Sequence, residues 1–171
     1  DVLVRFGLFA NDFVLLSIEG RDMSRIHLAL LYHGHDTDNT DTLQGINDFI
    51  HGFLSYQPKA ANIVAIADAD PECALANAYA ALLWMFLEAP VAPQKAAPYL
   101  ARAQALRSGT TAREALVIDA AEAWTRGAVP ELLEICDRIT ADHPRDMAVL
   151  KLAQYHLFNL GDAAGMLRMA L

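Results

Sequence analysis

The stretch RGAVPELLEICDRITADHPRD, residues 126–146, contains the turn residues that decide the fold class. Gly127 stands where a preceding helix would end, Pro130 opens the next helix, and Pro144 follows it. Glycine ends helices because it adopts the left-handed conformation at little cost. Proline suits the first helical turn because its missing N–H would have no partner there. The stretch therefore predicts one helix between two turns, which is half of a helix–turn–helix unit.

The same turn residues recur at a fixed spacing. Gly127 and Gly161 each stand at the end of an expected helix, and Pro144 lies midway between them. The interval between the two glycines equals the tetratricopeptide period, a helix–turn–helix unit of about 34 residues. Extending this period predicts units near 40–73, 74–112, 113–146 and 147–171, with APVAP at 89–93 lengthening the second unit. We therefore expect an all-α fold over residues 37–171, a tetratricopeptide-like α-solenoid of antiparallel helix pairs; an irregular helical bundle is the alternative.

The first 36 residues have a different composition and form a separate N-terminal segment in this interpretation. VLVRFGLF and FVLLSIEG flank the tripeptide AND and are rich in Val, Phe and Leu, which favours a β-hairpin. A helix fits RDMSRIHLALLYH, residues 21–33, equally well. The C-terminal GMLRMAL has no capping residue and the chain lacks an initiator Met, so we expect a fragment of a longer protein.

Composition limits the classes of partner. The formal net charge is -8 and no run of Lys or Arg occurs, which argues against binding to nucleic acid or to an anionic membrane surface. The longest apolar stretch, residues 74–87, is shorter than the roughly 20 residues that span a bilayer. Cys73 and Cys136 lie far apart without a C-x-x-C pair, which favours free thiols in a reducing, cytoplasmic setting.

One long segment resembles a known family. Residues 111–162, TAREALVIDAAEAWTRGAVPELLEICDRITADHPRDMAVLKLAQYHLFNLGD, are similar to the StaR-like tetratricopeptide family, which includes the tetratricopeptide repeat protein 38-like proteins. Its Thr-x-Arg-Glu helix start matches Thr111, Arg113 and Glu114, and its DHP-x-D motif matches residues 142–146. The resemblance extends over roughly residues 36–165, with FNLGD one residue longer than the family's turn, and does not cover residues 1–35. It implies an α-solenoid and no catalytic mechanism.

The densest group of potential metal ligands is HGHDTDNTD, residues 33–41. Imidazole and carboxylate groups such as His33, His35 and Asp36 can bind Zn²⁺ or another divalent ion when three or four converge. The alternative is a solvated linker whose Asp and Asn side chains cap the helix expected from residue 40. No nucleophile elbow, phosphate loop, dinucleotide fingerprint or H-E-x-x-H occurs. We therefore expect neither an enzyme nor a bound cofactor.

A helical repeat stack presents a concave surface lined by the first helix of each pair. With the unit boundaries given above, the residues expected on that surface and able to contact a partner are Met85, Trp124, Lys151, Tyr155 and Asn159. Such a groove could seat an extended peptide or an amphipathic helix. Trp124 fits the core between repeats equally well, whereas Tyr155, four residues after Lys151, is the better candidate for exposure.

These observations predict a protein–protein interaction scaffold with a protein partner, in an oligomer or a larger complex. They predict no nucleic-acid partner and no membrane insertion. One alternative is an accessory helical subunit of an enzyme complex, with a metal site at His33 and His35. Another is a structural spacer whose groove is filled by the apolar residues 1–18, which need burial.

Overall fold

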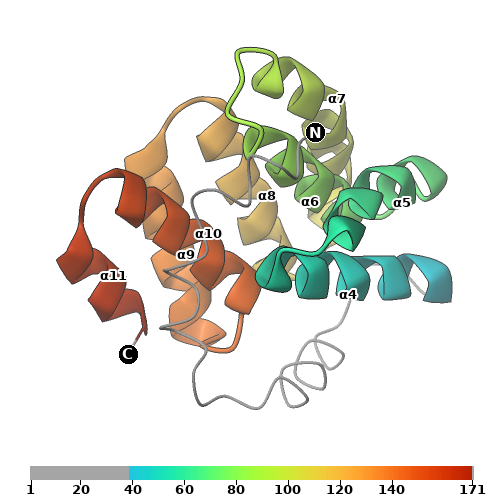
Figure 1. Ribbon diagram of the computed structural model, residues 1–171. Coiled ribbons are helices and arrows are strands. Elements are labelled where there is room, and N and C mark those ends of the chain that lie inside the picture. The colour runs from blue at the N-terminus through green and yellow to red at the C-terminus, as the bar shows by residue number, and fades with distance from the viewer. Residues whose placement is uncertain (1–38, 171) are drawn as a thin grey trace.

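The computed structural model describes residues 39–170, and this part of the chain is all-helical (Figure 1). The all-α prediction is thereby confirmed for these residues, whereas the predicted hairpin and the residues His33, His35 and Asp36 lie outside them. The elements are α4 Thr40–Ser55, η1 Pro58–Asn62, α5 Ile63–Ala69, α6 Ala74–Met85, α7 Ala92–Leu106, η2 Arg107–Gly109, α8 Ala112–Thr125, α9 Val129–Asp142, α10 Met147–Asn159 and α11 Ala163–Ala170.

Each helix packs against its neighbours in the sequence, and the chain also returns to its beginning. Helix α6 contacts α7 and α8, helix α9 contacts α8 and α10, and α11 contacts α10. Helix α10 contacts α4 as well, so that the two lie beside each other in Figure 1 although the whole of α5–α9 separates them in sequence. The first and one of the last described helices are therefore in contact, which is not the case in an open, extended stack of helix pairs.

Helix starts follow the predicted caps. The side chain of Asn39 accepts hydrogen bonds from the backbone N–H groups of Asp41 and Thr42, as expected for the residue that immediately precedes a helix. Thr111 caps α8 in a capping box, in which its side chain and that of Glu114 each accept a backbone N–H of the other. These side chains satisfy N–H groups that have no partner within the helix.

Three prolines lie close to or within the elements from η1 to α7. Pro58 begins a 3-10 helix. Pro71 lies in the turn before α6, which begins at Ala74 and ends at Met85. Helix α7 begins at Ala92 and tolerates Pro98 in its interior.

A residue in the left-handed conformation follows each of the helices α4, α6, α8 and α10. Within residues 39–170, positive φ angles occur at one residue shortly after each of these helices: Tyr56 (56°), Glu88 (49°), Gly127 (74°) and Gly161 (70°). At the two glycines the bonds match: Ala128 N–H donates to Ala123 C=O at 2.8 Å, and Asp162 N–H donates to Leu157 C=O at 2.9 Å. These are the hydrogen bonds of a left-handed helix C-cap. The ends of α8 and α10 therefore have the same geometry, as expected for equivalent positions of two repeat units.

Helix α6 is the most deeply buried element. Every residue from Ala74 to Leu83 is buried, and half of them are alanines, which let neighbouring helices approach closely. The largest fully buried apolar side chains around it come from α4, α5, α6, α8 and α9: Ile46, Ile63, Leu75, Ile118, Leu132 and Ile139. One hydrophobic core therefore joins the helices into one unit.

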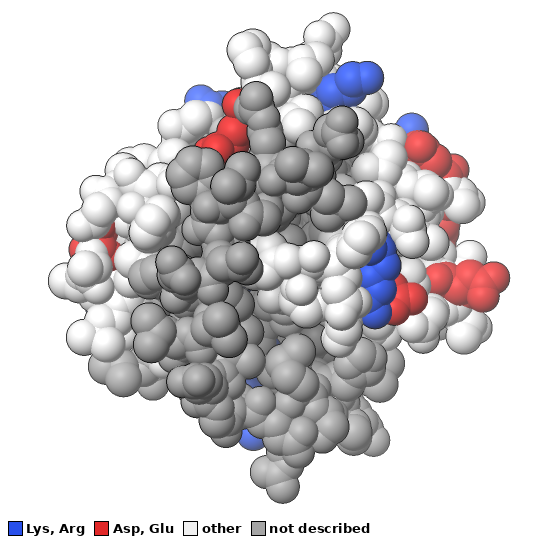
Figure 2. Space-filling view, viewed as in Figure 1, with Lys and Arg blue, Asp and Glu red and all other residues white. Residues whose placement is uncertain are grey.

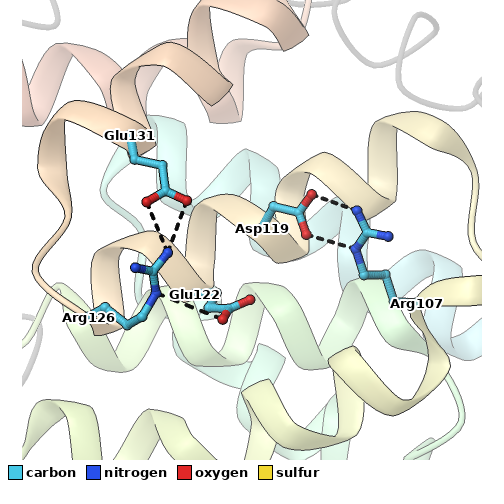
Figure 3. Close-up of polar contacts among 5 residues, drawn as sticks. All are labelled: Arg107, Asp119, Glu122, Arg126 and Glu131. Carbon is cyan, nitrogen blue, oxygen red and sulfur yellow. Dashed lines mark hydrogen bonds and ion pairs between the residues drawn. The ribbon is translucent and has the colours of Figure 1, made fainter.

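Surface ion pairs fix the turns on either side of α8 (Figure 3). The guanidinium of Arg107 donates two hydrogen bonds, 2.8 and 2.7 Å, to the carboxylate of Asp119. At the other end of the helix Arg126 donates to Glu131 at 3.0 Å and lies 3.8 Å from Glu122. Exposed pairs of this kind contribute at most about 1 kcal/mol each, so they orient the turns more than they stabilise the fold.

A buried ion pair connects the two segments that carry the family resemblance. The Nε atom of Arg113 donates to Asp146 at 2.7 Å, and its terminal nitrogen lies 2.6 Å from the same carboxylate and 3.3 Å from the Tyr79 hydroxyl. The second oxygen of Asp146 accepts the N–H of Val149 and so caps α10. The pair thus links the start of α8 to α6 and to the start of α10.

Candidate functional site

The five residues predicted to face a partner fall into two groups. Lys151, Tyr155 and Asn159 occur at intervals of four residues and therefore lie along one face of α10. Lys151 and Tyr155 are half-buried and Asn159 is exposed. Met85 and Trp124, in contrast, are each only 8% exposed. Only the residues on α10 are therefore available at the surface.

Trp124 belongs to an aromatic cluster inside the molecule. Its ring meets that of His156 at 4.5 Å and that of Phe86 at 4.6 Å between centroids, both edge to face. Tyr155 completes the cluster at 4.9 Å from Phe86 and 5.8 Å from Trp124. Of the two interpretations of Trp124, the structure supports core packing.

The space between the first helices of the units is filled by the protein's own side chains. A small apolar cavity of about 10 Å³ lies there, which is about the volume that a single water molecule needs. Its lining comes from α4, α6, α8 and α10, and from the residue that follows α6, and comprises Phe49, Phe53, Tyr79, Leu82, Phe86, Val117, Ala120, Ala148, Val149 and Leu152. This cavity has no room for a peptide, so any partner must bind outside it.

Lys151 joins α10 to the C-terminal end of α4. Its Nζ donates to the backbone carbonyl of Phe53, and it lies 4.6 Å from the centroid of the Phe53 ring and 3.4 Å from that of Tyr56. A cation is favoured at the carbonyl end of a helix and over aromatic rings. Burial acts in the opposite direction and lowers the pKa of Lys151 to about 7.

Tyr155 makes a second link, from α10 to the turn after α6. Its hydroxyl donates to the Oε1 atom of Glu88, which has a φ of 49° and lies three residues after the end of α6. Burial, and next the hydrogen bond to Glu88, raise the pKa of the Tyr155 phenol, while the side chain of Asn159 acts in the opposite direction. The phenol is therefore neutral and holds its proton at neutral pH.

His156 lies on the inner side of α10 beside Trp124. It is 5% exposed, and its Nε2 atom has no hydrogen-bond partner among the described residues. Burial lowers the pKa of His156 to about 4, so the ring is uncharged at neutral pH. An uncharged imidazole packs against the Trp124 ring as an aromatic group and contributes no charge to this surface.

Sequence reasoning missed the residues that surround Lys151 and Tyr155. Phe53 and Tyr56 lie at the end of α4, and Glu88 lies after α6. The contact between Lys151 and Phe53 joins residues 98 positions apart, whereas a repeat period describes contacts between adjacent units. The left-handed turns at Tyr56 and Glu88 carry no glycine, so no residue type at these positions indicated them.

Large apolar side chains are exposed at the C-terminal end of α10 and on α11. Phe158 is 46% exposed, and Leu160 and Leu167 are each 62% exposed. Arg168 and Asp137, both exposed, lie 3.7 Å apart and bring one charge of each sign to this region. Among the described residues on the face shown in Figure 2, the charged side chains form small separate groups.

Neither a metal site nor a membrane span is evident in the part of the chain that the structure describes. Residues 39–170 contain no cluster of three or more His, Cys, Asp or Glu side chains able to hold a metal ion. None of the described helices has both the length and the apolar character needed to cross a bilayer. Cys73 and Cys136 are buried free thiols, and burial raises the pKa of Cys136 to about 12.

Comparison with known proteins gives no relative. No family model, no curated protein and no solved structure matches the chain. The resemblance to the StaR-like tetratricopeptide family therefore remains a prediction from the sequence.

The lowered pKa of Lys151 predicts a pH dependence of stability. Between pH 7 and about 10.5 the unfolded amine holds a proton that the folded amine has released, so raising the pH favours the folded state. We expect the free energy of unfolding of the natural protein, minus that of Lys151→Met, to rise by at most about 1.4 kcal/mol per pH unit across this range. Urea denaturation at several pH values measures it. Since Cys136 titrates in both proteins, its effect cancels in the difference, and a flat difference would show that Lys151 stays charged.

Proposed function

We propose that this chain is a helical-repeat scaffold that binds a helix of a protein partner on the surface formed by the end of α10 and by α11. The observation that carries the proposal is the exposure of Phe158 on α10, of Leu160 in the turn that follows it and of Leu167 on α11, which packs against α10. Monomeric proteins rarely leave several large apolar side chains exposed together, and such groups commonly mark sites of protein contact.

The repeat architecture is part of the same proposal. Two features support a solenoid of antiparallel helix pairs: neighbouring helices contact one another in order, and a left-handed residue follows α4, α6, α8 and α10 within three residues. Helix α10 also contacts α4, and side chains of α4, α6, α8 and α10 fill the space between these helices. A partner would therefore meet the outer edge of α10, where Tyr155 and Asn159 flank the apolar residues.

The occupant that fits this surface is an amphipathic helix. An apolar stripe at i, i+3 and i+4 spacing can bury Phe158 and Leu160, as in other grooves that receive helices. The charge pair Arg168–Asp137 at the edge carries both signs, so polar residues of either charge on the partner helix can border the contact. The surface thus distinguishes one partner helix from another mainly by the shape and the apolar area of that helix.

The test combines crosslinking with affinity measurements. A photoreactive amino acid at position 160 should crosslink one partner protein in the native host, and the same group at Gln104, which is exposed on α7, should not. The purified partner should then bind the natural chain. Its affinity should fall at least about tenfold, or about 1.4 kcal/mol, with Leu160→Ser and Leu167→Ser combined.

Gln104→Ser provides the matched control, because it replaces an exposed side chain on a different helix. Its affinity should stay within about twofold of the natural chain. If the Leu160 and Leu167 variant also binds with unchanged affinity, the partner uses another surface and the proposed site is wrong.

A further inference from the structure

Helix α11 presents an apolar stripe on its outer side. It lies at the edge of the molecule and packs on α10 (Figure 1), where it buries Gly165 and Met166. Its exposed side carries Ala163, Ala164 and Leu167, at the i, i+3 and i+4 spacing of one helix face. None of these three residues is charged. Helix α11 is therefore itself an amphipathic helix of the kind that the surface beside it can receive.

The small residues of α11 allow another helix to come close. On the inner side, a Cβ atom at Gly165 would meet the Leu157 side chain at 2.9 Å, so α11 already lies tightly against α10. On the outer side, Ala163 and Ala164 add little bulk, and the side chains at a contact set the distance between two packed helices. If two α11 helices run antiparallel, Leu167 of each one lies beside these alanines of the other.

A second copy of this chain offers one matching apolar surface. Among residues 39–170, large apolar side chains are exposed at Val91, Phe158, Leu160 and Leu167, and the last three form the surface at α10 and α11. Val91 lies apart from them, immediately before α7, and is 39% exposed. Two copies that bury their exposed apolar groups together must therefore use the same surface on each, which is the arrangement of a two-fold dimer.

The charges at the edge of this surface are complementary to themselves. The chain has a formal net charge of -8, so two copies repel each other over most of their surface. At this edge, however, Arg168 and Asp137 contribute one charge of each sign, are 63% and 48% exposed, and lie 3.7 Å apart. A two-fold contact brings Arg168 of each copy towards Asp137 of the other, which replaces one loose pair in each chain by two pairs between the chains.

We infer that the helix bound by this surface is α11 of a second copy of this chain, so that the protein forms a two-fold dimer through α10 and α11. The inference rests on the docking surface of the proposed function and names its partner. Three partly exposed apolar side chains make a small contact, and small contacts are typical of weak and transient association. We therefore expect a dissociation constant between about 1 and 100 µM.

Sedimentation equilibrium of the full chain between about 1 and 200 µM measures this association. The average mass should rise from that of one chain towards that of two. Leu167→Ser removes the central apolar contact and should raise the dissociation constant at least about tenfold. Val91→Ser is the matched control, because it removes the exposed apolar side chain that lies outside the contact, and it should leave the constant within about twofold.

Exchanging the charges tests the two-fold arrangement itself. In Arg168→Asp alone all facing charges are negative, and in Asp137→Arg alone all are positive, so each variant should dimerise at least about threefold more weakly. An equimolar mixture of the two variants restores opposite charges across the contact, and its association should return to within about twofold of the natural chain. Loss of the pair within one chain would not be repaired by mixing, so a mixture no stronger than either variant would overturn this arrangement.

Failure of the dimer and failure of the proposed function can be told apart. A chain that keeps the mass of one copy up to about 200 µM overturns the dimer, as do equal dissociation constants for Leu167→Ser and Val91→Ser. In the native host, the photoreactive group at position 160 should give a product of twice the mass of the chain. A crosslink to a different protein instead would retain the proposed function and reject the second copy, and the absence of any crosslink would reject both.

Discussion

Replacing Asp146 by Asn should lower the free energy of unfolding by about 3–5 kcal/mol, because it leaves the buried guanidinium of Arg113 without its counter-charge. The two side chains are 6% and 2% exposed, and their closest atoms are 2.6 Å apart. Asparagine keeps the size of the side chain and can still accept the N–H of Val149 as an N-cap. The expected loss therefore isolates the ion pair from the cap, and urea denaturation measures it.

Two further variants make this measurement specific. Asp119→Asn breaks the exposed pair with Arg107 and should lower the free energy of unfolding by less than about 1 kcal/mol. The double variant Arg113→Leu with Asp146→Asn removes the unpaired charge and should recover part of the stability. If Asp146→Asn unfolds at the same urea concentration as the natural protein, the buried pair is not what holds α8 and α10 together.

The all-helical architecture could be predicted because turn residues and apolar periodicity are local properties. Gly127 and Gly161 mark helix ends through their positive φ angles, and Asn39 and Thr111 mark helix starts through their side-chain oxygens. Each of these preferences acts within a single helical turn and needs no tertiary contact. The left-handed ends at Tyr56 and Glu88 could not be predicted, because neither residue type favours that conformation.

The candidate site was predicted only along one helix for a related reason. Lys151, Tyr155 and Asn159 share a face of α10 by spacing alone. Whether that face is open or covered depends on the return of α10 to α4, which joins residues 98 positions apart. No local pattern encodes such a contact, so Phe53 and Tyr56 remained outside the sequence-based prediction. The exposure of Leu160 and Leu167 could not be predicted for the same reason, since it depends on which helices pack against α10 and α11.

Replacing Trp124 by Ala should lower the free energy of unfolding by about 3–5 kcal/mol, as is usual for a large aromatic side chain removed from a core. The ring is 8% exposed and meets Phe86, Tyr155 and His156, so its loss opens a cavity where α6, α8 and α10 converge. Phe158→Ala is the natural comparison. That ring is 46% exposed, and its removal should lower the free energy of unfolding by less than about 1 kcal/mol.

The two aromatic residues therefore separate stability from recognition. If Trp124→Ala is strongly destabilised while Phe158→Ala keeps its stability, the inner aromatic cluster serves the fold, and the exposed end of α10 remains the candidate surface for a partner. A loss below about 1 kcal/mol for Trp124→Ala would contradict this division. It would mean that the ring contributes little to the core, and the space around Trp124 would again be a candidate groove for a peptide.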